Sequence, residues 1–174
     1  MSQEIGQSEE SERTTAPIEN GFPIRQLNDI AEKEGYGGAR QWYRPIYTMH
    51  KWWARRLGST FRAISLYSLL DDPDRTDVYE PGADQQLSSF EGGRNDLERL
   101  ISSVSIEKPD ALWELYPKDV RISDKKILDP FMGGGTSLVE ASRFGAECHG
   151  RDLNPVAWFV TKEEIDAGST DPEK

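Results

Sequence analysis

The sequence predicts an α/β fold in which the first strands of an open parallel sheet follow a helical N-terminal region. Residues 126–129 and 147–151 are predicted to be short strands. Each is followed by a segment typical of a helix, at 136–144 and from Pro155 to about Ile165, where Asn154 and Pro155 form an N-cap and a first helical position. Strand–helix–strand–helix order is characteristic of parallel sheets with helices packed on them.

Two helices are predicted ahead of the sheet. Apolar residues recur at helical spacing between Pro23 and Glu34, and Gly35 provides a stop. A second helix is predicted over about 52–70, with Leu57, Phe61 and Ile64 on one face. The glycine-bearing segment at 35–47 is predicted to be loop or extended.

We divide the chain into five segments by composition. The first is polar and acidic, with almost nothing to bury. The middle contains DDPDRTD, EPGADQQ and EGG, and such runs are typical of linkers and surface insertions. The segments are a disordered acidic tail (1–16), a helical N-terminal domain (17–70), a polar insertion with short helices near 95–104 and from Pro109 (71–121), the sheet segment (122–167) and a short tail (168–174).

Composition narrows the class of protein. No apolar run approaches the ~20 residues that cross a bilayer, and the polar, acidic N-terminus resembles neither a signal nor a transit peptide. Cys148 is the single cysteine, which excludes an internal disulfide and fits a reducing compartment. We therefore expect a soluble, cytoplasmic protein without a membrane partner. The net charge of −10, with 13 arginines against 8 lysines, resembles proteins of salt-loving microbes.

A basic island stands out in this acidic chain. Residues 35–70 contain no Asp or Glu but six basic side chains, and at their centre lies the string MHKWWARR, residues 49–56. Arginine and lysine next to tryptophan suit a surface that binds phosphates and stacks on bases. The alternative is that the tryptophans are core residues and the arginines extend past them to solvent. The residues alone leave both open.

The string ILDPFMGGGT, residues 127–136, predicts a ligand-binding turn. Glycines between a strand and a helix let the backbone approach a ligand closely. An acidic residue at the end of the next strand can accept hydrogen bonds from ribose hydroxyls, and Asp152 lies 23 residues after Asp129. The dinucleotide fingerprint fails because Leu138 occupies its sixth position, and no Gly-Lys-Ser/Thr ending forms a P-loop. A turn that only connects two elements is the alternative.

ILDPFMGGGT resembles the DPF-x-G-x-G-T motif of amino-group DNA methyltransferases, and HGRDLNP resembles the following segment that grips the ribose. The resemblance implies a Rossmann-like class I methyltransferase sheet and S-adenosyl-L-methionine as cofactor. It places Asp129 on the methionine ammonium side, the glycine turn under the cofactor and Asp152 on the ribose. The cofactor-binding residues it implies are Asp129, Pro130, Phe131, Gly133, Gly135, Thr136, Asp152 and Asn154.

The segment FPIRQLNDIAEKE followed by HKWWARR resembles the N-terminal domain of unknown function in large adenine-specific DNA methylases. Together with the turn, the resemblance covers about residues 18–70 and 122–167. Leu57 departs from it, because proline is expected after the paired arginines. The resemblance implies that this segment leads a helix that packs at the cofactor's methionine end. The residues expected to contact nucleic acid or cofactor are His50, Lys51, Trp52, Trp53, Arg55 and Arg56.

No D/N/S-P-P-Y/F/W tetrad occurs in the chain, so we assign no catalytic residue. His50, His149 and Cys148 lack metal-site spacing, and no metal is expected. The resemblance implies part of a DNA methyltransferase acting on adenine N6 or cytosine N4, in host marking or defence. We expect DNA as a partner. Either a second polypeptide supplies the rest of the domain, or the chain is a gene fragment. In both cases the chain alone should be inactive. The alternatives are a non-catalytic DNA- or partner-binding subunit or remnant, and an RNA methyltransferase.

Overall fold

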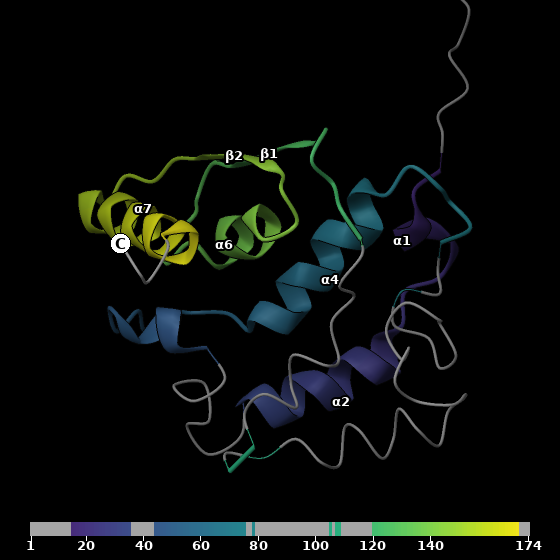
Figure 1. Cartoon of the computed structure of the whole chain (residues 1–174), viewed down its shortest axis with the longest axis horizontal. Coiled ribbons are helices and arrows are strands. Elements are labelled where there is room, and N and C mark those ends of the chain that lie inside the picture. Colours follow the sequence, from purple (N-terminus) through teal and green to yellow (C-terminus); the bar gives the residue numbers. More distant parts are fainter. Residues whose placement is uncertain are drawn as a thin grey trace, which may run out of the picture.

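The structure, a computed structural model, describes residues 15–35, 44–75, 78, 105, 107–108 and 120–170. It is a mixed α/β arrangement in which a small parallel sheet lies at one edge of a set of helices (Figure 1). Its elements are α1 (Pro17–Asn20), α2 (Ile24–Gly35), the 3₁₀ helix η2 (Pro45–Thr48), α4 (Gly58–Leu69), β1 (Lys126–Asp129), α6 (Thr136–Ser142), β2 (Glu147–Gly150) and α7 (Pro155–Ser169).

The predicted strand–helix–strand–helix unit is confirmed. β1 and β2 pair in parallel, with Lys126 opposite Glu147 and Asp129 opposite Gly150. The crossover between them is α6, which ends two residues before the predicted end. α7 begins at Pro155 as predicted, because the Asn154 side chain accepts a hydrogen bond of 3.0 Å from the Val156 amide, but it continues to Ser169.

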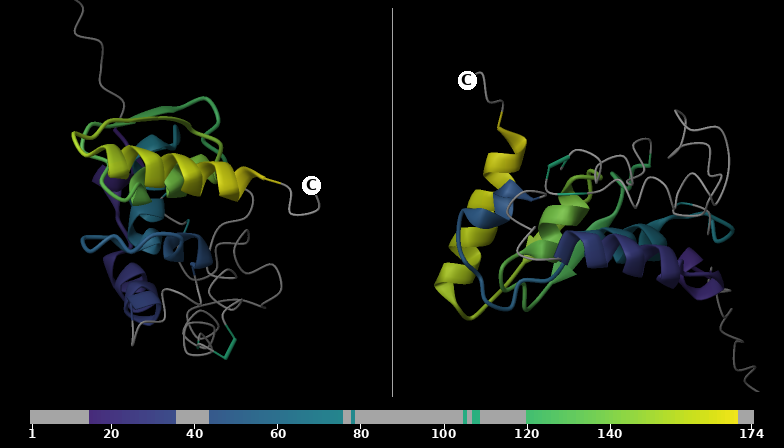
Figure 2. Two further views of the ribbon diagram at one scale, coloured as in Figure 1. Left: turned by 90° about the vertical axis from the view of Figure 1, so that its left-hand side faces the viewer. Right: turned by 90° about the horizontal axis from the view of Figure 1, so that it is seen from below.

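The helices lie in series across the molecule. α2 contacts α4, α4 contacts α6, and α6 contacts both the sheet and α7. The views in Figures 1 and 2 agree on this order, with α2 and α7 on opposite sides. A continuous core joins the N-terminal helices to the sheet unit, and its buried hydrophobic members are Leu27, Ile30, Ala63, Leu66, Tyr67, Val78, Val120, Ile122, Ala141, Phe144 and Ala146.

The second predicted helix starts later than its pattern indicates. α4 begins at Gly58 rather than near Trp52, and Ile64 is 37% exposed instead of facing the core. The reason lies in α2, where Glu34 accepts hydrogen bonds from the amides of Gly58 (3.2 Å) and Ser59 (3.0 Å). A carboxylate at these amides satisfies the free donors of a helix N-terminus and fixes where the helix begins.

Other predictions of local structure have mixed outcomes. Within the segment expected to be loop or extended, residues 45–48 form η2, which starts at Pro45. The short helix α1 was not predicted. The helices expected at 95–104 and from Pro109 lie outside the described residues, as do most of the acidic tail and the polar insertion.

A buried ion-pair network joins α4 and α6. Glu140 of α6 is fully buried; its carboxylate accepts hydrogen bonds from Arg62 Nε (2.9 Å) and from the Tyr47 hydroxyl (2.6 Å). Arg44 is also fully buried, 3.7 Å from Glu140 and hydrogen-bonded to Glu34 at 2.9 Å. Burial raises the pKa of Glu140, but the positive charges of Arg44 and Arg62 outweigh burial and lower it to about 2. Glu140 is therefore ionised in the folded protein at neutral pH.

No helix in the described part of the chain is long and apolar enough to span a bilayer. The same residues contain no cluster of His, Cys, Asp and Glu that could hold a metal ion.

The Glu140 network predicts a pH-dependent stability. The folded pKa of about 2 lies below the ordinary glutamate value of 4.5, so the contribution is complete above about pH 5 and is lost as the pH falls toward 2. It amounts to about 3 kcal/mol. Urea unfolding between pH 7 and pH 3 measures this contribution to the free energy of unfolding.

Glu140→Gln should be less stable at pH 7 by about 3–5 kcal/mol, and its stability should fall less steeply below pH 5. Glu32→Gln, which changes an exposed side chain, should behave as wild type. Equal pH slopes for both variants would contradict the network's role.

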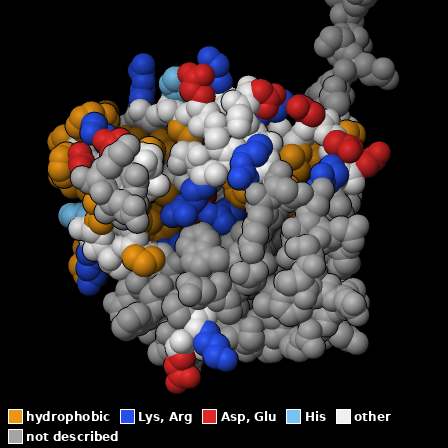
Figure 3. Space-filling view, viewed as in Figure 1, with side chains coloured by type: hydrophobic (Ala, Val, Ile, Leu, Met, Phe, Trp, Pro, Cys, Tyr) orange, Lys and Arg blue, Asp and Glu red, His pale blue; other side chains and the backbone are white. Residues whose placement is uncertain are grey.

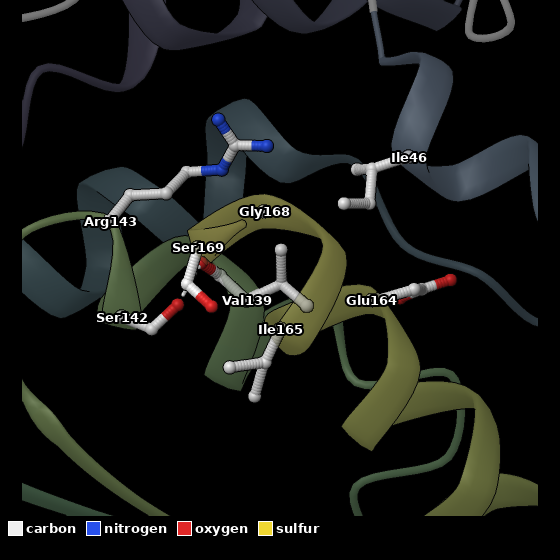
Figure 4. Close-up of a pocket in the computed structure, with 8 residues that line it drawn as sticks. All are labelled: Ile46, Val139, Ser142, Arg143, Glu164, Ile165, Gly168 and Ser169. Atoms are coloured by element: carbon white, nitrogen blue, oxygen red, sulfur yellow. Dashed lines mark hydrogen bonds between the residues drawn. The ribbon is translucent and has the colours of Figure 1, made fainter. Parts of the chain in front are cut away.

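A small cavity of about 150 Å³ predicts a stabilising substitution. It lies between η2, α6 and α7, with the side chains of Ile46, Val139 and Ile165 on its walls and Gly168 at its rim (Figure 4). A Cβ at Gly168 would lie 3.6 Å from Cδ1 of Ile46, which is an ordinary van der Waals contact. Because glycine also disfavours helix, Gly168→Ala should raise the free energy of unfolding by about 0.5–1 kcal/mol. A fall in the urea midpoint would show that the helix end does not tolerate the methyl group.

Candidate functional site

The glycine turn, residues Asp129–Gly135, connects the end of β1 to the start of α6. Gly133 and Gly135 have φ of +51° and +72°, a region that side chains disfavour. The Met132 amide donates to the Arg151 carbonyl at 3.1 Å, so the turn is tied to the end of β2. Both strands therefore present their carboxyl ends at one edge, where ligands bind in open parallel sheets.

Asp152 follows β2 at this edge. Its carboxylate accepts hydrogen bonds from the amide of Gly133 (2.9 Å) and from the amide of Asn154 (2.8 Å). These two backbone bonds, Asn154 first, lower the pKa of Asp152, so the carboxylate is ionised at neutral pH. The predicted pairing of the turn with an acidic residue 23 positions after Asp129 thus corresponds to a direct contact in the structure.

Asp129, at the end of β1, is held in one orientation. Its carboxylate accepts a hydrogen bond of 3.0 Å from the Phe131 amide and one from the Ser137 hydroxyl. Two oxygens of an ionised carboxylate offer about four acceptor positions, so Asp129 keeps acceptor capacity for a ligand. Ser137, one residue beyond the predicted motif, is thus a positioning residue that the sequence reasoning missed.

Trp52 covers the turn from the N-terminal region. A Cβ placed on Gly134 would lie 2.8 Å from Cγ of Trp52, and one on Gly133 would lie 3.4 Å from its Nε1. The first distance is too short for any side chain. Gly134 is therefore required for the approach of Trp52, a role that the sequence motif did not indicate because its pattern leaves this position free.

Arg55 fastens the turn to α7. Its guanidinium donates to the Gly134 carbonyl at 2.7 Å and makes two hydrogen bonds, of 2.6 and 3.0 Å, to the carboxylate of Glu164. Arg55 is 7% exposed and Glu164 is fully buried. Burial raises the pKa of Glu164, and the Arg55 partner opposes that shift. Here Arg55 contacts the protein's own turn, so its guanidinium is not displayed to an external phosphate.

A cavity of about 250 Å³ lies between the turn and the segment 52–56. Its walls combine the turn backbone, two arginines and one aspartate, aromatic rings and small polar groups. The lining residues include Asp129, Phe131, Gly133, Gly134, Ser137, Trp52 and Arg56. It is the cavity that brings the two sequence-predicted clusters together.

The remaining predicted residues lie in different environments. Phe131 is 82% exposed, whereas Thr136 is buried in the first turn of α6. Trp53 is 86% exposed, with the Lys51 ammonium 4.0 Å from its ring centre, and so differs from Trp52 beside it. The His50 ring lies 6.4 Å from that of Trp52. Within this string, Trp52 and Arg55 contact the turn, whereas Trp53 and Arg56 are exposed.

Comparisons with known proteins are limited in extent. Residues 21–99, just under half of the chain, match a family described as "Protein of unknown function (DUF1156)". A stretch of 45 residues, 26% of this chain, is 47% identical to the type II methyltransferase M.MvaI of Kocuria varians and spans 10% of that protein's length. No solved structure matches.

The clamp formed by Arg55 predicts a large, specific loss of stability. Arg55→Ala leaves the Glu164 carboxylate buried without its partner, which costs about 3–5 kcal/mol. Arg56→Ala is the matched control: its side chain is exposed, and the change should stay within about 0.5 kcal/mol. Urea unfolding of both variants tests this. The double variant Arg55→Ala/Glu164→Ala should recover part of the lost stability. A double-mutant cycle that shows no coupling energy between Arg55 and Glu164 would contradict the clamp.

Proposed function

We propose that the chain is the cofactor-binding part of an S-adenosyl-L-methionine-dependent DNA methyltransferase of the amino-group class, and that its sheet is the beginning of a Rossmann-like domain. The observation that carries the proposal is the contact between Gly133 and Asp152, 2.9 Å long, beside a cavity at the carboxyl edge of two parallel strands. The partial similarity to a type II methyltransferase supports the same reaction class.

The residues present fit such a cofactor. The turn contributes to the cavity wall through Gly133 and Gly134. Asp152 is an ionised acceptor suited to ribose hydroxyls. Asp129 is an oriented carboxylate suited to the methionine ammonium. When bound, the cofactor supplies an activated methyl group on a sulfonium, and the chain's own residues bind and orient it.

The sequence lacks the motif that holds the target base in this class of enzyme. The tetrad that grips an exocyclic amine in amino-group methyltransferases is absent from the sequence. A two-stranded parallel sheet is also unusual by itself, because parallel strands are normally covered on both faces. Hydrophobic side chains gather over α7 (Figure 3), where Trp158 and Phe159 are 55% and 56% exposed, and Leu153 before the helix is 97% exposed.

These features support a complementing part that adds strands beside β2 and covers α7, either in a longer polypeptide or in a second one. That part would supply the tetrad and most DNA contacts. The exposed Trp53, with Lys51 against its ring, favours a contribution of this chain to DNA binding. The same pair supports the second candidate, a DNA-binding subunit without catalysis, which would bind DNA but no cofactor.

Calorimetric titration with S-adenosylmethionine distinguishes the two candidates. We expect the full chain to bind, and Asp152→Ala to weaken binding at least tenfold, because a charge-assisted hydrogen bond to a ribose hydroxyl contributes about 1.5–3 kcal/mol. Asp29→Ala, which removes an exposed carboxylate on α2, is the control and should bind as wild type. Undiminished binding by the Asp152 variant would refute the proposed site.

A second measurement concerns catalysis. The chain by itself should transfer no methyl group from labelled cofactor to DNA, because its sequence lacks the tetrad that holds the base amine. Incorporation of label into DNA by the purified chain would contradict this expectation.

A further inference from the structure

The cavity beside the glycine turn carries two opposite charges. Arg56 lines it from the N-terminal segment, and Asp129 lines it from the end of β1. The other wall residues are neutral apart from Arg55, whose charge is compensated by Glu164 at 2.6 Å. A ligand group that enters this cavity therefore meets one available cation and one carboxylate.

The guanidinium of Arg56 is available to a ligand, whereas that of Arg55 is engaged within the protein. Arg55 is buried and engaged with the turn and α7, whereas Arg56 is exposed. Among the residues that the structure describes, Arg56 takes part in no hydrogen bond or ion pair. A guanidinium presents paired N–H donors whose spacing matches the two oxygens of a carboxylate.

Asp129 supplies the complementary charge in a fixed place. Its bonds to the Phe131 amide and the Ser137 hydroxyl hold the carboxylate still, so its position does not depend on a ligand. A cation and an anion on the walls of one cavity complement a zwitterion, which carries both an ammonium and a carboxylate. Gly133 and Gly134 line the same cavity.

We propose that Arg56 binds the α-carboxylate of the cofactor's amino-acid end, opposite Asp129, and so makes the site selective for a ligand with a complete α-amino acid. This inference rests on the proposed function and adds a specificity-determining residue to it. It also assigns a binding role to a residue inside the matched segment 21–99, whose family has no described function.

The alternative ligand for Arg56 is a DNA phosphate, and the position of the side chain argues against it. Arg56 lines the cavity together with the glycine turn, whereas the exposed pair of Lys51 and Trp53 is outside that lining. Phosphates of a nucleic acid backbone bind best on open, basic surfaces. A cavity of about 250 Å³ with a carboxylate on its wall suits a small zwitterion better.

The test compares two ligands that differ only in the carboxylate: S-adenosylmethionine and its decarboxylated form. The full chain is titrated with each by calorimetry. Wild type should prefer the carboxylate-bearing ligand at least tenfold, as a charge-assisted bidentate contact requires. Arg56→Ala should bind that ligand at least tenfold more weakly, bind the decarboxylated ligand as wild type does, and so lose the preference. Arg56→Lys should recover part of it, because a single ammonium keeps the charge but not the paired donors.

Arg25→Ala is the matched control, since it removes one exposed positive charge on α2, outside the cavity lining. It should keep the wild-type preference. If Arg56→Ala retains the preference, or weakens binding of a DNA duplex and leaves the preference intact, the assignment is wrong although the proposed function stands. If wild type binds neither ligand, the proposed function is wrong and the assignment fails with it.

Discussion

The buried carboxylate of Glu140 is the interaction on which the rest of the molecule depends. It lies in the helix that follows the glycine turn and is held by Arg62 and Tyr47, both from the N-terminal region. An ionised group in the interior is stable only with its partners in place. The helix that carries the turn is therefore positioned by residues that lie about 80 to 90 positions earlier, and the N-terminal helices and the sheet form one body.

The consequence for the site is that two distant sequence segments build it together. The sheet segment provides the glycine turn and the carboxylates of Asp129 and Asp152. The N-terminal segment provides Trp52, Arg55 and Arg56. Trp52 and Arg55 contact the turn directly, one by packing and one through the Gly134 carbonyl. The N-terminal segment thus has a physical role in shaping the cavity.

The sequence predicted the sheet unit well because its signals are local. A strand of four residues, a glycine bend and an Asn-Pro helix start are each specified by neighbouring residues. The start of α4 was mistaken because its cap, Glu34, belongs to another helix. The buried charges Glu164 and Arg62 were missed, although each lies on the buried face of its helix. Glu164 shares that face with Ala157, Val160 and Thr161. Arg62 shares it with Ala63 and Leu66. A charge in such a stripe indicates an internal partner, but the partner's identity depends on tertiary contacts.

The cap that Glu34 provides also constrains how this region can change during evolution. Because the first turn of α4 draws its acceptor from the last turn of α2, each helix presents a surface that only the other completes. Recombination that exchanged one helix without the other would leave either a buried acid without its hydrogen-bond donors or two amides without their acceptor. The two helices should therefore be inherited as a pair, and chimaeras between homologues should place their junctions before α2 or after α4.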